Sequence, residues 1–266
     1  MRADVPAPAP LRVLFLDADI VAVSKPPGML VHKAPRAPDD APVLLQTLKA
    51  QIGRWLYPVQ RLDRATSGVI AFALTSPAAA ALQRSLASPG CRKDYLTLVR
   101  GQPPARFASQ RPLTDERGQP RPAHTEFRTL LRFSGCALVR ARILTGRSNQ
   151  IRRHLNHLGH HVLGDTTFGK GRLNRLYRAR FALPRLFLHA TRLCFDHPTA
   201  PGRVRLRDRL PDDLRAVLRR LAEFERPSRA RRGEQGVVVA QRPPADEGAH
   251  RPLDPGEQTG QPAGAV

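Results

Sequence analysis

Short apolar runs of strand length restrict the fold of this chain more than any other feature of its sequence. Each run suits a β-strand and is too short for most helices. The runs lie at residues 13–16, 20–23, 69–74 and 95–99, and two further strands are predicted near 137–144 and 186–195. The segment Asp17-Ala18-Asp19 joins the first two runs and indicates a hairpin, and the segment Lys25-Pro26-Pro27-Gly28 indicates a turn after the second.

Fewer segments show helical spacing. Residues 44–52 repeat apolar side chains with a helical period, and Ser76-Pro77 begins a helix that stops near Gly90. Two further helices are predicted at 150–158 and 212–224. Strands interleaved with a few helices, without regular alternation, are typical of an α+β fold. We predict a single domain built on a mixed or antiparallel β-sheet with flanking helices.

The ends of the chain differ from its body. Residues 1–10 are predicted to be a flexible N-terminus. Residues 226–266 are predicted to be a disordered tail, because 12 of these 41 residues are Pro or Gly. Residues 11–225 are the predicted folded domain, which is long enough to bury a sizeable core.

Positive charge is concentrated in this folded body. The chain has 44 Lys and Arg against 22 Asp and Glu, a formal net charge of +22, of which the tail carries only +1. Because such a charge attracts polyanions, nucleic acid is the expected partner. A purely structural basic protein is disfavoured, because the charge belongs to a patterned globular domain.

Other classes of protein are disfavoured by what the sequence lacks. No apolar run approaches the ~18 residues of a membrane-spanning helix, and the first residues do not resemble a signal peptide. Cys91, Cys136 and Cys194 are odd in number and far apart, so no disulfide framework is expected. We therefore expect a cytoplasmic protein with reduced thiols and no membrane association.

An aspartate between two arginines is the first candidate for chemistry. Asp63 lies between Arg61 and Arg64, and Thr66-Ser67-Gly68 separates it from an apolar strand. Flanking guanidinium groups favour a charged carboxylate, and a turn at a strand edge presents it to a cleft. Arg-x-Asp-Arg alone is more often a surface ion pair. The octapeptide 61–68 before a buried strand is more specific, so Asp63 is the catalytic candidate.

The predicted helix 150–158 provides the second candidate. Ile151 lies on the face directed at the core, and Arg152 stands beside it in the first turn. The helix dipole disfavours a cation there, so Arg152 is expected to have an anionic partner, a phosphate or a carboxylate. Ser148 or Asn149 is expected to cap this helix.

Residues 140–192 form an unusually basic stretch. They include twelve Lys or Arg and a single acid, Asp165. Such a stretch repels itself unless it faces a polyanion. Its Gly-rich segment 163–171 is a predicted loop that lacks the Gly-Lys-Ser/Thr ending of a P-loop. The residues expected to contact RNA are Arg153, Lys170, Arg172 and Arg175.

Four histidines of the same stretch raise the alternative of a metal site. They are His154, His157, His160 and His161. Apart from Asp165, no Cys or acidic third ligand stands nearby, so zinc is disfavoured and no metal is expected. The histidines are expected to face RNA or solvent.

Tyr95 lies in a predicted strand, where its ring either stacks on an extruded base or packs in the core.

Taken together, these segments resemble the RluA-type pseudouridine synthases. The resemblance is carried in order by residues 25–32, 61–68, 93–95, 145–152 and 164–165. It implies the pseudouridine synthase fold and an isomerisation, in which the C1′–N1 glycosidic bond of a uridine breaks and the base re-attaches through C5. It also implies that the enzyme needs no cofactor, neither metal, nucleotide nor redox group.

The resemblance assigns roles to individual residues. It implies that Asp63 is the catalytic group, as nucleophile or base. It implies that Tyr95 stacks on the target uracil and helps to remove the C5 proton, and that Arg152 pairs with Asp63. Arg61, Arg64, Arg147 and Ile151 are the expected active-site support.

Within the family, the chain is most similar to members that modify tRNA. The similarity lies at residues 46–53, 172–175 and 186–190. The extra RNA-binding domain that many ribosomal members carry before the catalytic domain has no room before residue 11. The resemblance therefore implies a tRNA partner, with uridine 65 as the target, and a monomer is the default expectation.

Two alternatives stay open, namely the same chemistry on ribosomal RNA and a non-catalytic RNA-binding protein of the same fold. Gln60 and Asn149 stand where the family usually has His. These replacements keep hydrogen-bonding capacity but remove a titratable ring, which mildly favours the non-catalytic alternative. The presence of Asp63, Tyr95 and Arg152 favours an active enzyme.

Overall fold

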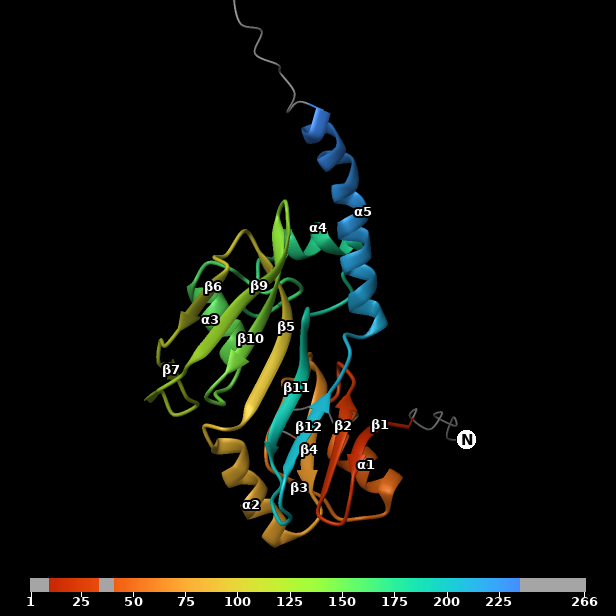
Figure 1. Ribbon diagram of the computed structural model, residues 1–266, viewed down its shortest axis with the longest axis vertical. Coiled ribbons are helices and arrows are strands. Elements are labelled where there is room, and N and C mark those ends of the chain that lie inside the picture. The colour runs from red at the N-terminus through yellow and green to blue at the C-terminus, as the bar shows by residue number, and fades with distance from the viewer. Residues whose placement is uncertain (1–9, 34–40, 235–266) are drawn as a thin grey trace, which may run out of the picture. The chain divides into compact units, whose positions relative to one another are not determined.

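The computed structural model describes residues 10–33 and 41–234 (Figure 1). The chain divides into two compact units, Met1–Pro227 and Ser228–Val266. The predicted flexible N-terminus lies outside the described residues except for Pro10, as does the predicted tail beyond residue 234. None of the helices in the described ranges is both long and apolar enough to span a membrane.

Most strands of the described residues join one ten-stranded mixed sheet. They are β1 (Arg12–Leu16), β2 (Ile20–Lys25), β3 (Tyr57–Pro58), β4 (Ser67–Ala73), β5 (Arg92–Arg100), β6 (Arg106–Ser109), β9 (Thr125–Phe133), β10 (Cys136–Ile143), β11 (Leu188–Asp196) and β12 (Arg203–Arg207). The strand order is β1-β2-β4-β11-β5-β10-β9-β6, with β12 paired to β11 and β3 paired to β4. A separate ribbon pairs β7 (Leu113–Thr114) with β8 (Pro120–Arg121).

The pair β4 and β11 runs parallel, and the other pairs of the sheet are antiparallel. The prediction of an α+β fold with a mixed sheet is therefore confirmed. In the parallel pair, Gly68 of β4 lies opposite Ala190 of β11. Gly68 has a φ of +119°, and a Cβ atom there would lie 2.2 Å from the Ala190 carbonyl oxygen. Only glycine permits this close approach, which sets where the Asp63 loop enters the sheet.

Five helices of the described residues flank the sheet. They are α1 (Leu44–Ile52), α2 (Ser76–Ala87), α3 (Gln150–His157), α4 (Gly171–Phe181) and α5 (Asp212–Glu234). Helices α1 and α2 share a core with β2 and β4, and α3 buries Ile151 and Leu155 against residues of β9 and β10. Helices α4 and α5 cover Leu98 and Leu138 of the sheet. Figure 1 shows α2 near one end of the sheet and α4 near the other.

Some elements differ from the sequence prediction. Strands β6, β9 and β12 and helix α4 were not predicted, because arginines and other polar residues interrupt their apolar residues, which form no long run. Helix α5 continues beyond the predicted end at residue 224 to Glu234, into the first residues of the predicted tail.

Candidate active site

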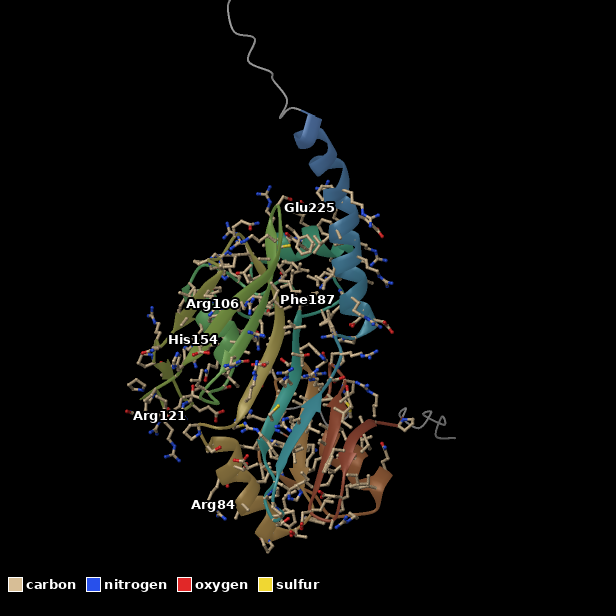
Figure 2. All side chains as sticks on the ribbon, in the orientation of Figure 1. Arg84, Arg106, Arg121, His154, Phe187 and Glu225 are labelled. Atoms are coloured by element: carbon tan, nitrogen blue, oxygen red, sulfur yellow. The ribbon has the colours of Figure 1, made fainter. Side chains whose placement is uncertain are left out.

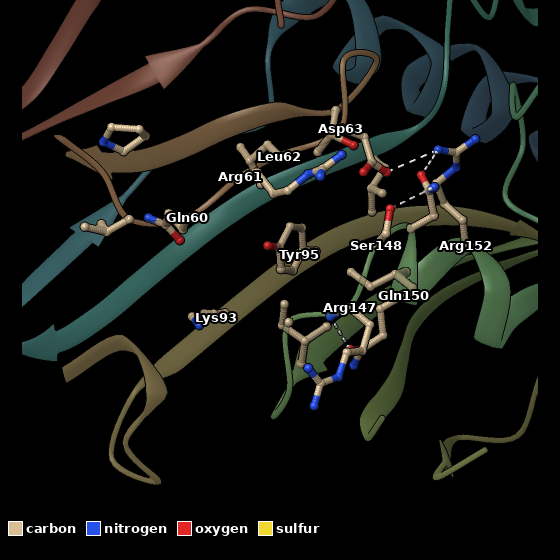
Figure 3. Close-up of a pocket in the computed structure, with 18 of the residues that line it drawn as sticks. Gln60, Arg61, Leu62, Asp63, Lys93, Tyr95, Arg147, Ser148, Gln150 and Arg152 are labelled. Atoms are coloured by element: carbon tan, nitrogen blue, oxygen red, sulfur yellow. Dashed lines mark hydrogen bonds and ion pairs between the residues drawn. The ribbon is translucent and has the colours of Figure 1, made fainter. Parts of the chain in front are cut away.

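A cleft of about 510 Å³ opens where the loop before β4 meets β5, the end of β10 and the start of α3 (Figure 3). This volume is within the range of ligand-binding pockets. Six residues predicted for the site line it, namely Arg61, Asp63, Tyr95, Arg147, Ile151 and Arg152. The structure therefore brings together motifs that are far apart in the sequence.

Hydrogen bonds from the turn after β2 stabilise the loop that carries Asp63. The Nζ of Lys25 donates to the carbonyl oxygen of Arg64 at 3.1 Å, and the backbone N–H of Gly28 donates to the same oxygen at 2.8 Å. Within the loop, the N–H of Thr66 donates to the Asp63 carbonyl at 3.0 Å. These bonds explain why a Lys-Pro-Pro-Gly turn accompanies the aspartate motif.

Arg152 joins two carboxylates. Its Nε and Nη2 donate to both oxygens of Asp165 at 2.7 and 2.8 Å, in a bidentate pair. Its Nη1 donates to Oδ2 of Asp63 at 3.2 Å, as Figure 3 shows. The guanidinium carbon also lies 5.0 Å from the ring centre of Phe168. The expected anionic partner of Arg152 is thus a pair of carboxylates.

The two carboxylates differ in exposure. The Asp165 side chain is 1% exposed, whereas that of Asp63 is 20% exposed. Among the described residues, Oδ1 of Asp63 has no hydrogen-bond partner. Asp165 therefore anchors Arg152, and Arg152 anchors one oxygen of Asp63 while the other remains available in the cleft.

The electrostatics of Arg152 and Asp165 support this arrangement. Burial raises the pKa of Asp165, but the hydrogen bonds from Arg152 and from the backbone of Phe168 outweigh it, so the net pKa lies below the ordinary value. Burial lowers the pKa of Arg152, but its bonds to Asp165 and Asp63 outweigh that effect and raise it. Both groups are charged at neutral pH.

Tyr95 lies on β5 and lines the same cleft as Asp63. Burial raises the pKa of its phenol far above the usual value, and the negative charge of Asp63 adds to this shift. The hydroxyl is therefore protonated at neutral pH. Its ring contributes a flat apolar surface beside a carboxylate.

A model of the RNA pseudouridylate synthase family matches residues 19–157, just over half of the chain. The chain belongs to this family. It is similar to the tRNA pseudouridine synthase C of Vibrio cholerae, with 36% identity over 210 residues that cover 71% of this chain and 86% of the relative. The enzyme of the same name from Pasteurella multocida is 37% identical over 210 residues, with the same coverage.

Solved structures agree on the fold. Human RNA Pseudouridylate Synthase Domain Containing 4 has a TM-score of 0.65 and 24% identity, and covers 79% of this chain and 93% of its own. Human RNA Pseudouridylate Synthase Domain Containing 1 has a TM-score of 0.63 and 24% identity, and covers 81% and 94%. The resemblance to RluA-type pseudouridine synthases is confirmed, and this protein is an RNA-modifying isomerase of that family.

The remaining predicted residues of the synthase lie outside the cleft lining. Arg64 turns away, and its Nε donates to the Gly28 carbonyl at 2.9 Å. Arg153 is half-buried, and its Nη1 donates to the Thr114 carbonyl at 2.9 Å. The predicted RNA contacts on and beside α4 are also exposed, namely Lys170, Arg172 and Arg175.

Gln60 and Asn149, the two departures from the family pattern, both line the cleft. Asn149 stands at the N-cap position of α3 with a φ of +53°, but α3 has no side-chain cap hydrogen bond. The predicted cap by Ser148 or Asn149 is therefore right in position and wrong in its hydrogen bond. Its Oδ1 instead accepts a hydrogen bond from Arg152. Among the described residues, Nε2 of Gln60 and Oγ1 of Thr66 are buried without a hydrogen-bond partner. Buried polar atoms without a partner are rare, so these two are available to a ligand.

Two of the histidines correct the prediction that all four face RNA or solvent, because His154 and His161 are both buried. His154 is fully buried. Its Nδ1 lies 2.9 Å from Oγ1 of Thr125, and its Nε2 lies 3.0 Å from the carbonyl oxygen of Arg111. In the described ranges, no three His, Cys, Asp or Glu side chains are grouped so that they could hold a metal ion.

The sequence did not single out Lys25 as part of the site, although it lies in the first motif. Its side chain is fully buried, and its Nζ donates to the carbonyls of Pro26 and Arg64. Burial lowers its pKa to about 7, against the opposing effect of Asp63. Lys25 is thus a buried residue whose hydrogen bond to the Arg64 carbonyl stabilises the Asp63 loop.

We expect this lysine to make stability depend on pH. Below pH 7 both folded and unfolded states carry the charge, so the cost of burying it is fully present. Between pH 7 and 10.5 the unfolded state still binds the proton that the folded state has released, so stability rises with pH. The free energy of unfolding, measured with urea from pH 6 to 10, should rise in the wild type relative to Lys25→Met. A Lys170→Met control should show no such difference, and equal pH slopes in Lys25→Met and wild type would contradict the assignment.

Proposed function

We propose that this synthase converts uridine 65 of a tRNA to pseudouridine, with Asp63 as the catalytic group. The observation that carries the proposal is the Asp63 carboxylate, bonded through one oxygen to Arg152 and open to the cleft through the other. The choice of tRNA rests on the similarity to the tRNA pseudouridine synthases C. The protein acts as a cytoplasmic monomer in this proposal.

The isomerisation needs no external reactant. The C1′–N1 bond breaks, a C1′–C5 bond forms, C5 loses a proton and N1 gains one. A carboxylate beside the ribose assists either as a nucleophile at C1′ or as a base. In both roles the carboxylate must carry a charge and stay in position. The hydrogen bond from Arg152 keeps Asp63 in position.

Tyr95 receives the target base. A uridine reaches the cleft only after it leaves its stack, at a cost of a few kcal/mol that phosphate contacts offset. The Tyr95 ring stacks on the extruded uracil. Its hydroxyl acts as a relay that accepts the C5 proton while it passes its own proton on, so that one proton in all moves from C5 to N1. The unpaired Gln60 Nε2 and Thr66 Oγ1 are hydrogen-bond donors for the bound nucleotide.

The surrounding cations position the RNA backbone. Arg61 and Arg147 line the cleft and contact the phosphates next to the target. Ile151 lines the same cleft and supports the site with an apolar side chain. The half-buried Arg153 and the exposed Lys170, Arg172 and Arg175 contact more distant phosphates. Arg64 acts indirectly, because its carbonyl oxygen anchors the loop through Lys25.

Pseudouridine mapping of total RNA from cells with and without this gene tests the proposal. Chemical labelling followed by sequencing should show the loss of pseudouridine at position 65 of tRNA. Loss of a ribosomal RNA site instead would preserve the chemistry and overturn the substrate. An unchanged map would overturn the proposed activity.

A further inference from the structure

The face of the sheet opposite the cleft carries rows of arginines. In the first row, Arg140 of β10 pairs with Arg128 of β9, which pairs with Arg106 of β6. Residues that are directly opposite on neighbouring strands point to the same face. Strands lie about 4.8 Å apart, so these three side chains form a closely spaced line. Arg106 is labelled on β6 in Figure 2.

A second row lies beside the first. Arg142 of β10 pairs with Asp94 of β5, Asp94 with Arg192 of β11, and Arg192 with Arg207 of β12. Arg140 and Arg142 are two residues apart on one strand, so both rows share one face. We call Arg106, Arg128, Arg140, Arg142, Arg192 and Arg207 the arginine face.

The alternation along β5 and β10 places this face away from the cleft. Lys93, Tyr95 and Ile143 line the cleft. Asp94 and Arg142 are their neighbours in the chain, and successive side chains of a strand point to opposite faces. On the same face as the arginines, α4 and α5 cover Leu98 and Leu138. The helices therefore cover the part of this face around these two leucines and leave the arginines uncovered.

The positive charge of the arginine face is largely unbalanced. Buried Asp94 bonds Arg142 at 3.1 Å and the adjacent Arg92 at 2.7 Å. Glu126 lies 3.9 Å from Arg142. In the part of the chain that the structure describes, no ion pair involves the other five arginines of the face.

The arginines are close enough to repel one another. Burial lowers the pKa of Arg140, and the charges of Arg92, Arg142 and Arg128 lower it further, against the effect of Asp94. Five cations without carboxylate partners on one sheet face favour the binding of an anion with several charges.

We propose that the arginine face binds the phosphate backbone of a second segment of the same RNA whose target uridine enters the cleft. This inference rests on the proposed function. β6 ends the sheet, so one RNA can contact both faces by passing around this edge. Rows of guanidinium forks on a flat surface suit phosphates, which they bind in a bidentate manner. An acidic protein partner is the alternative that the test addresses.

The test compares two probes and two matched variants of the full chain. The probes are an in vitro transcribed tRNA and a short hairpin cut from it around the target uridine. The variant Arg106→Gln/Arg128→Gln/Arg140→Gln removes the first row. The control Arg84→Gln/Arg178→Gln/Arg219→Gln removes the same charge from exposed helix surfaces.

We expect the first variant to bind the tRNA at least about tenfold more weakly. The slope of log affinity against log salt should fall by about 2, since each lost phosphate contact removes about 0.7–0.9. Hairpin affinity and hairpin turnover should stay within about twofold of wild type, and the control variant should match wild type on both probes. If the triple variant unfolds, Arg106→Glu/Arg128→Glu, which changes only exposed residues, replaces it.

Unchanged tRNA binding by the first variant would overturn the proposal and leave the face to another partner. An equal loss on the hairpin, or an equal loss in the control, would also overturn it, because either result would show a general charge effect. Hairpin turnover by the wild type separately tests the proposed function. Its absence would defeat the tRNA assignment without altering the binding comparison, because phosphate contacts do not depend on sequence.

Discussion

Asp63→Asn should lower the turnover of this synthase by at least about 10³-fold while RNA affinity stays within about twofold of wild type. An amide is neither a nucleophile nor a base of comparable strength, so the chemical step is lost. Its oxygen still accepts the Arg152 Nη1–H, so the loop keeps its position. Single-turnover pseudouridine formation on a substrate tRNA, with filter binding of the same RNA, measures both quantities.

The matched control for this variant is Asp196→Asn. The side chain of Asp196 is 65% exposed and lies 3.9 Å from Arg203, and Asp196 is not among the residues that line the cleft. The control variant should retain wild-type turnover and affinity. Near-normal turnover by Asp63→Asn would show that the catalytic group lies elsewhere.

Arg152→Ala should damage both the stability and the activity of the protein. It leaves the buried Asp165 carboxylate without its bidentate partner, and breaking a buried ion pair costs about 3–5 kcal/mol. It also releases Asp63 from its only side-chain donor among the described residues. Turnover should fall by at least about 10²-fold. Urea denaturation and single-turnover kinetics measure the two effects.

The double variant Arg152→Ala/Asp165→Ala separates these two effects. Removing Asp165 takes away the unpaired buried charge, so the double variant should be more stable than Arg152→Ala. Turnover should not recover, because Asp63 still lacks its donor. Recovery of turnover together with stability would show that Arg152 serves folding alone.

The sequence predicted the central strands well, because continuous apolar runs signal a strand that is buried on both faces. β4 is the clearest case, with all seven of its residues buried. β12 was missed, although its sequence RVRLR alternates at the strand period. Its arginines pointed to solvent and its two apolar residues were too few to stand out. The same alternation hid β9 and the arginine face.

Part of the cleft lining was also predictable, because its residues belong to motifs that can be recognised in the sequence. Asp63, Tyr95 and Arg152 were named from their motifs. The need of Arg152 for an anion followed from its place in the first turn of a helix. The partner Asp165 was not identified, because it lies 13 residues further along the chain and beyond the end of the helix.

The sequence by itself determined the fold class, the positive charge of the body and the residues available for chemistry, because these depend on composition, local periodicity and motif. The tertiary structure alone decided which of these residues meet. Asp63 and Arg152 are 89 residues apart in the chain, and Lys25 supports a loop 39 residues away. Strand pairing sets such distances, and each pairing depends on packing across the whole sheet. The same pairing placed Tyr95 in the cleft and its neighbour Asp94 among the arginines on the opposite face.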